Sequence, residues 1–140
     1  MSCPTAARGE RAPGSRLRAP DAFFVHAGGP AGTPRLGAVL LLGTGAGAVP
    51  IERLAEQVRE RVRSRAPTLP MLSRRLDVRP GRWPRWRPVA DVDPDAHVGA
   101  VVVGPGRQVT WGGVLREFFD ADPPAHGPPW RLRLLRDEGD

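Results

Sequence analysis

The spacing of apolar residues predicts a helix in the middle of the chain. From Ile51 onward, apolar side chains recur every three or four positions, while arginine and glutamate occupy the positions between them. Pro50 stands where the first turn would begin, a position that proline tolerates because its missing N–H has no partner there. We expect this helix to run from residue 51 to about residue 66, because Pro67 follows.

Two weaker helical signals flank that segment. Apolar residues lie broadly on one side of a predicted helix over residues 108–119. Near the start of the chain, Asp21 precedes an apolar run and could cap a short helical turn that buries Phe23 and Phe24.

One continuous apolar run is typical of a strand that is covered on both faces. Residues 36–42 are uninterrupted by charge and are bounded by proline and glycine, so they predict the central strand of a sheet. We expect Val58 and Val62 of the predicted helix to face that sheet at Leu40 and Leu42.

Shorter strands complete the predicted fold. Residues 72–78 and 86–89 flank the turn residues Pro80 and Gly81, residues 98–103 are apolar, and residues 130–135 alternate apolar with charged. Interleaved helices and strands favour an α/β or α+β class, here a partial two-layer sandwich with a mixed sheet and two main helices. The domain is expected to span residues 17–140, after a tail over residues 1–16.

Composition limits the functional classes. The net charge of +6 would suit nucleic acid or an anionic membrane, but all 21 basic residues are arginine, a bias that GC-rich coding produces by itself. Cys3 is the only cysteine, so neither an intrachain disulfide nor a cysteine-based zinc site is expected. The start of the chain lacks the apolar core of a signal peptide, and residues 36–51 are too short to span a bilayer, so we expect a cytoplasmic protein.

Two motifs have a functional and a structural interpretation. Residues 43–48 match the glycine pattern of a dinucleotide-binding turn, but no acidic residue follows at the distance that a ribose contact needs, which favours a plain loop. In residues 79–87, four arginines interleave with Trp83 and Trp86 and could stack bases while neutralising phosphates. We interpret this stretch as a hairpin with packed tryptophans and solvated arginines, so nucleic acid is not the favoured partner.

The acidic residues and histidines predict no catalytic or metal centre. Asp91, Asp93 and Asp95 alternate before His97 but lack the further ligands of a calcium loop, so a solvated turn is expected. His26 and His126 have no nucleophile or carboxylate placed to suggest a triad.

Several short phrases, in order, resemble the wax ester synthase/diacylglycerol acyltransferase family of bacteria. They are Leu17-Arg18-Ala19-Pro20-Asp21, Leu36-Gly37-Ala38-Val39, Leu69-Pro70-Met71-Leu72 with Arg75-Leu76, Trp86 followed by Asp93-Pro94-Asp95 and His97-Val98, Phe119-Asp120, and Pro128-Pro129-Trp130. The opening proline is displaced by one position, and Pro129 replaces the leucine of the family's Pro-Leu-Trp phrase.

The resemblance implies half of a chloramphenicol-acetyltransferase-like domain, from enzymes that transfer a long-chain acyl group from acyl-CoA to diacylglycerol or a fatty alcohol. It implies structural or tunnel-lining roles for Asp21, Arg75, Trp86, His97, Pro128 and Trp130. In that family a His-His-x-x-x-Asp-Gly motif supplies the general base, and this sequence does not contain it. We therefore expect no catalytic residue, no bound cofactor or metal, and no activity without a second polypeptide that carries the histidines. Such enzymes work at a membrane or lipid-droplet surface, and the alternative function is a small arginine-rich module that binds nucleic acid or anionic lipid.

Overall fold

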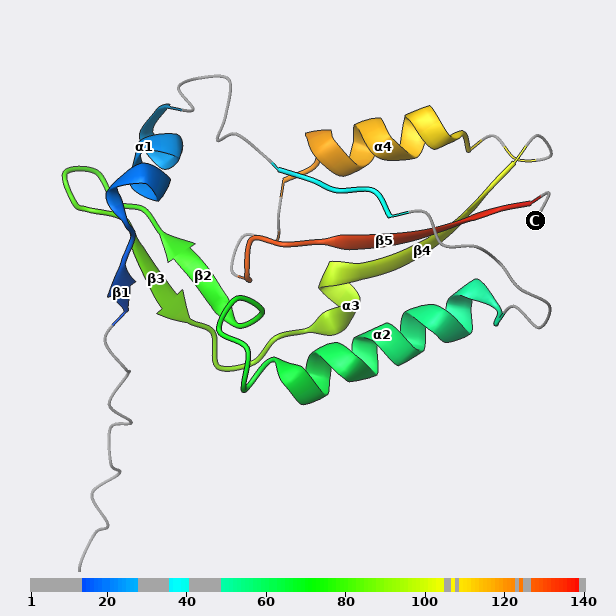
Figure 1. Cartoon of the computed structure of the whole chain (residues 1–140), viewed down its shortest axis with the longest axis horizontal. Coiled ribbons are helices and arrows are strands. Elements are labelled where there is room, and N and C mark those ends of the chain that lie inside the picture. The colour runs from blue at the N-terminus through cyan, green and yellow to red at the C-terminus, as the bar shows by residue number, and fades with distance from the viewer. Residues whose placement is uncertain are drawn as a thin grey trace, which may run out of the picture.

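The computed structural model describes residues 14–27, 36–40, 49–104, 107, 109–122, 124 and 127–138 (Figure 1). Within this part of the chain, four helices and two small sheets form a mixed α and β fold. The elements are β1 (Ser15–Arg16), α1 (Ala19–Ala27), α2 (Ile51–Arg65), β2 (Arg74–Asp77), β3 (Arg85–Pro88), α3 (Pro94–His97), β4 (Val98–Val103), α4 (Trp111–Asp120) and β5 (Leu132–Asp137).

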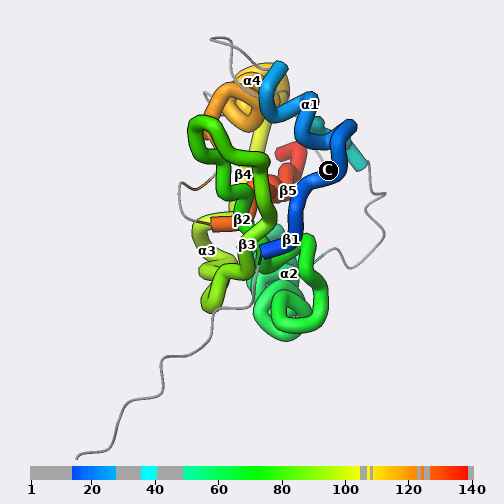
Figure 2. Tube along the Cα trace, turned by 90° about the vertical axis from the view of Figure 1, so that its left-hand side faces the viewer, coloured from blue at the N-terminus to red at the C-terminus, as the bar shows by residue number. Residues whose placement is uncertain are grey.

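The β4–β5 sheet and α2 form the main core. The two strands are parallel, with Val98 opposite Leu132 and Val103 opposite Asp137. Parallel neighbours need a crossover, and α4 provides it. Figures 1 and 2 show α2 on one face of this sheet and α4 on the other. The buried apolar side chains come from α2 and α4 as well as from β4: Ile51, Ala55, Val62, Val98, Val103 and Val114.

Polar contacts fix α4 to the end of the parallel sheet. The indole Nε1 of Trp111 donates to Asp137 Oδ2 at 3.1 Å. Arg131, just before β5, donates to the carbonyl of Phe118 at 2.8 Å and also to that of Ala121. The two bonds from Arg131 satisfy carbonyl groups at the C-terminal end of α4, where no further helical turn supplies N–H donors.

The second sheet is antiparallel, in the order β1-β3-β2. Leu76 lies opposite Trp86, and Ser15 pairs with Trp86 from the other side. The β2–β3 hairpin turns at Gly81, whose φ of +69° is a conformation that side chains with a Cβ rarely adopt.

Several sequence predictions are confirmed. Helix α2 begins at Ile51 as predicted, β4 has the predicted bounds, and the predicted hairpin turns at Pro80-Gly81. The mixed class is also confirmed. However, parallel and antiparallel pairings occur in two separate sheets instead of one mixed sheet.

The predicted central strand over residues 36–42 is wrong in its described part. Residues 36–40 form no strand, and Leu36 and Leu40 are exposed, while residues 41 and 42 lie outside the described residues. An apolar run in a sequence favours burial, but it does not show which surface covers the run. Helix α2 packs on β4 and β5, and its Val62 is buried, whereas Leu40 is exposed.

Two predictions at the start of the chain need correction. Phe23 and Phe24 lie within α1 and are exposed, and Ala22 is the buried residue of that helix. Consecutive helical positions point in different directions, so both phenylalanines could not share the face that Ala22 buries. Ser15 and Arg16, assigned to a tail, form β1 and pair with β3.

Candidate functional site

The six residues singled out by the family resemblance fall into one contacting group and three scattered positions. Asp21 lies exposed in the first turn of α1, Arg75 is half-buried on β2, and Trp86 is half-buried on β3. The other three lie close together, at the end of α3 and before β5: His97, Pro128 and Trp130.

His97 and Trp130 form a stacked pair across 33 residues of chain. The imidazole is buried, with 4% of its surface exposed, and its centroid lies 4.3 Å from the indole at an interplanar angle of 26°. His97 Nδ1 lies 2.8 Å from the carbonyl oxygen of Trp130, and because a carbonyl only accepts, Nδ1 carries the hydrogen. Trp130 Nε1 in turn donates to the carbonyl of Leu72 at 3.1 Å.

The other ring nitrogen of His97 faces the loop before β5. A Cβ built on Gly127 would lie 3.0 Å from His97 Nε2, so this glycine lets the loop approach the imidazole closely. Pro128, next in the chain, is fully buried. The described hydrogen-bond partner of His97 is a backbone carbonyl, and His97 holds α3 against the start of β5.

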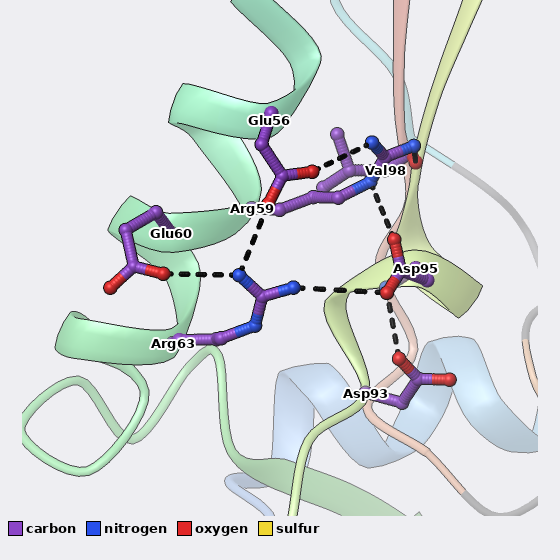
Figure 3. A network of polar contacts seen from close by, with 7 residues as sticks. All are labelled: Glu56, Arg59, Glu60, Arg63, Asp93, Asp95 and Val98. Carbon is purple, nitrogen blue, oxygen red and sulfur yellow. Dashed lines mark hydrogen bonds and ion pairs between the residues drawn. The ribbon is translucent and has the colours of Figure 1, made fainter. Parts of the chain in front are cut away.

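The acidic row before His97 is used for capping and ion pairing. Asp93 is the N-cap of α3, and its Oδ1 accepts from the N–H of Asp95 at 3.0 Å. Asp95 pairs with Arg59 at 2.8 Å and with Arg63 at 3.8 Å, which ties α3 to α2 (Figure 3). Among the described residues, no group of three or more histidine, cysteine or acidic side chains could hold a metal ion.

Arg59 is the centre of this network. Its NH2 group donates to the carbonyl of Val98 at 3.1 Å, and NH1 donates to Glu56 on the same helix (Figure 3). Its buried Nε lies close to Asp95 Oδ1 without the alignment of a hydrogen bond, so that contact is an ion pair. The network therefore joins α2, α3 and β4 and has a structural role.

An arginine-lined hollow lies on the antiparallel sheet. Its volume is about 390 Å³, and its charged lining comes from Arg16, Asp77, Arg79, Arg82, Arg85 and Arg87. Because side chains alternate along a strand, the pairing places Arg16, Arg75, Arg85, Arg87 and Asp77 on one face of the sheet. The opposite face has Leu76 and Trp86.

Asp77 orders two of these arginines. It accepts from Arg87 Nε at 2.7 Å and from Arg79 Nε at 3.1 Å. Both hydrogen bonds favour the ionised carboxylate, so Arg87 first and Arg79 second hold the pKa of Asp77 below its ordinary value of 3.8. The Asp77 carboxylate therefore stays ionised to a lower pH than an aspartate without these partners.

Trp83 forms part of the wall of the hollow. Its Nε1 donates to the carbonyl of Leu17 at 2.9 Å, which fixes the ring, while 44% of the residue stays exposed. The sequence interpretation is therefore confirmed for the hairpin, but Trp83 is less packed than expected.

Sequence reasoning missed the contribution of Arg16 because it assigned that residue to a tail. The alternation Arg85-Trp86-Arg87 places those two arginines on one face of a strand, but no local pattern places Arg16 beside them.

The remaining candidates add no site. Residues 43–48 and His126 lie outside the described residues, and His26 is exposed on α1. No described helix has the length and apolar character needed to cross a bilayer.

The chain was also compared with known proteins. No family model, no curated protein and no solved structure matches it.

Proposed function

We propose that this chain is the N-terminal portion of an O-acyltransferase that moves a long-chain acyl group from acyl-CoA to diacylglycerol or a fatty alcohol. The residues would form half of a chloramphenicol-acetyltransferase-like domain. In this proposal the chain supplies scaffold, and a second polypeptide supplies the catalytic histidines at a membrane or lipid-droplet surface.

The contact between His97 and Trp130 is the observation that supports the proposal most. The two residues belong to separate phrases of the family resemblance, and Trp130 also bonds to Leu72 in a third phrase. Three phrases that are distant in sequence thus meet at one point. A chance likeness of short phrases gives no reason for them to meet, whereas a shared fold does.

The same geometry argues against His97 as the general base. A base must reach the hydroxyl whose proton it takes, at a distance of about 3 Å or through one water. Nδ1 of His97 is used by the Trp130 carbonyl, and Nε2 faces Gly127, which lies so close that a Cβ there would crowd the imidazole. The acceptor hydroxyl would therefore need a base from elsewhere.

The proposal can be tested by identifying the partner. The tagged chain is purified from the cells that encode it, and the proteins that accompany it are sequenced. We expect a polypeptide with a His-His-x-x-x-Asp-Gly motif among them. A bait variant with Trp130→Ala, which breaks the contact with Leu72, should recover less of that polypeptide than a bait with His26→Ala.

If no protein with that motif accompanies the chain, the proposal is wrong.

A further inference from the structure

Two pairs of arginines face each other directly across the strands of the antiparallel sheet. Arg16 on β1 lies opposite Arg85 on β3, and Arg75 on β2 lies opposite Arg87 on β3. Side chains directly opposite on antiparallel strands have Cβ atoms about 5 Å apart, and like charges in such pairs destabilise the sheet. Asp77 lies opposite Arg85 on the other side and pairs with Arg87, so it offsets part of this repulsion. One carboxylate does not balance both arginine pairs, and an additional anion would stabilise the arrangement.

The protein supplies too little negative charge on this face. Five arginines line the hollow, against the single carboxylate of Asp77. That carboxylate accepts from Arg79 and Arg87 through their Nε atoms, so it does not occupy the NH1 and NH2 groups of either guanidinium. Those terminal groups form the fork that binds phosphate oxygens in pairs.

The dimensions suit more than one phosphate group. Arg85 and Arg87 are two residues apart on β3, or about 7 Å along the strand, and β1 and β2 lie about 4.8 Å to either side. The hollow of about 390 Å³ has the size of a small-molecule site, for which 300–1,000 Å³ is typical. A single phosphate could reach only some of these guanidinium groups.

We propose that this hollow is a binding site for a small soluble anion that carries two linked phosphate groups. The anion lies between Arg16, Arg85 and Arg87, which all line the hollow, and neutralises the facing pair of Arg16 and Arg85. The site is independent of the acyl transfer proposed above, because it lies on the antiparallel sheet and uses none of the residues around His97.

Calorimetry with inorganic pyrophosphate at physiological ionic strength tests the site. We expect saturable binding with one pyrophosphate per chain. Arg85→Gln should weaken this binding about tenfold, because it removes one charge-assisted contact with the anion. Arg16→Gln should weaken binding to a similar extent.

The matched control is Arg116→Gln. This variant removes the same charge from an exposed position on α4, away from the hollow. It should change the affinity less than twofold. Equal weakening in Arg116→Gln and Arg85→Gln would show that only the overall charge matters and would overturn the proposal.

Thermal unfolding provides a second measurement that does not depend on affinity. Pyrophosphate should raise the melting temperature of the wild-type chain, because a ligand that binds only the folded state stabilises it. Without the anion, Arg16→Gln should melt at the same temperature as wild type or higher, since Arg16 faces only Arg85 across the sheet and its loss relieves that like-charge pair. A lower melting temperature for Arg16→Gln would contradict the argument from facing arginines.

Two other ligands separate this proposal from its rivals. A single-stranded oligonucleotide and vesicles that contain phosphatidylglycerol both present phosphate groups, but on a macromolecule or a surface. If either one binds through Arg85 while pyrophosphate does not bind, the site serves nucleic acid or membrane, and the proposal of a small soluble ligand is wrong.

Discussion

Truncating His97 to alanine should weaken the fold, because this side chain joins α3 to the chain segment that enters β5. The substitution removes the imidazole that stacks on Trp130 at 4.3 Å and the Nδ1–H that donates to the Trp130 carbonyl. It also empties the space between Trp130 and Gly127, in a place where His97 is almost completely buried.

The expected loss can be estimated from these contacts. A hydrogen bond contributes about 0.5–1.5 kcal/mol net, and an aromatic pair about 0.5–1.5 kcal/mol beyond its buried area. The cavity and the unpaired Trp130 carbonyl add to this, so His97→Ala should lower the free energy of unfolding by about 2–4 kcal/mol. His97→Asn should lose about half as much, because the asparagine amide can donate from nearly the same place as Nδ1.

Urea unfolding followed by far-ultraviolet circular dichroism measures these losses without relying on the tryptophan signals. The slope of the unfolding free energy against urea should stay constant, so that a shift in midpoint reports stability alone. His26→Ala is the control, because His26 is exposed on α1 and its loss should change stability by less than about 0.5 kcal/mol. If His97→Ala were as stable as His26→Ala, the His97–Trp130 pair would not hold the fold together.

Three further predictions follow from single features. Val62→Ala should lower the free energy of unfolding in urea by about 1–3 kcal/mol, because Val62 lies on the buried face of α2. Gln57→Ala, on the exposed face of the same helix, should lower it by almost nothing. Gly81→Ala should lose about 1 kcal/mol because of its positive φ, although nothing blocks a methyl group there, while Gly112→Ala in α4 should gain a few tenths; losses of equal size would refute the backbone argument. The pKa of Asp77 is lowered in the folded state, so its stabilising effect is fully present well above the ordinary pKa of 3.8 and is lost as the pH falls through the folded pKa. The stability difference between wild type and Asp77→Asn should therefore be constant from pH 5 to pH 7 and shrink below about pH 4, and a difference that grows on acidification would contradict this sign.

The sequence predicted the elements whose own residues specify them. The periodic apolar face of α2 and the valine run of β4 carry their burial pattern locally, and Pro80-Gly81 supplies the turn of the hairpin. These elements need no knowledge of distant segments.

The elements that failed depend on what lies beside them. The apolar run over residues 36–40 predicts a buried strand, but burial needs a neighbouring apolar surface. The surface that we expected, on α2, packs against β4 and β5. Ser15 and Arg16 are too few to show a strand pattern, and their structure comes from the hydrogen bonds that β3 offers.

The candidate sites follow the same division. The basic hairpin was visible in sequence as Arg85-Trp86-Arg87, but the facing pairs with Arg16 and Arg75 depend on strand register, which no local pattern gives. Similarly, His97 and Trp130 were each singled out by resemblance, and only the fold brings them into contact.

The release of CoA most directly tests the proposal that this chain supplies scaffold and a second polypeptide supplies the catalytic histidines. The purified chain is given palmitoyl-CoA with diacylglycerol or hexadecanol, alone and together with the polypeptide that carries the His-His-x-x-x-Asp-Gly motif. We predict that the chain alone releases CoA no faster than buffer, and that release above this rate requires both polypeptides. Turnover by the isolated chain would contradict the account, because it would mean that a residue within these 140 supplies the base.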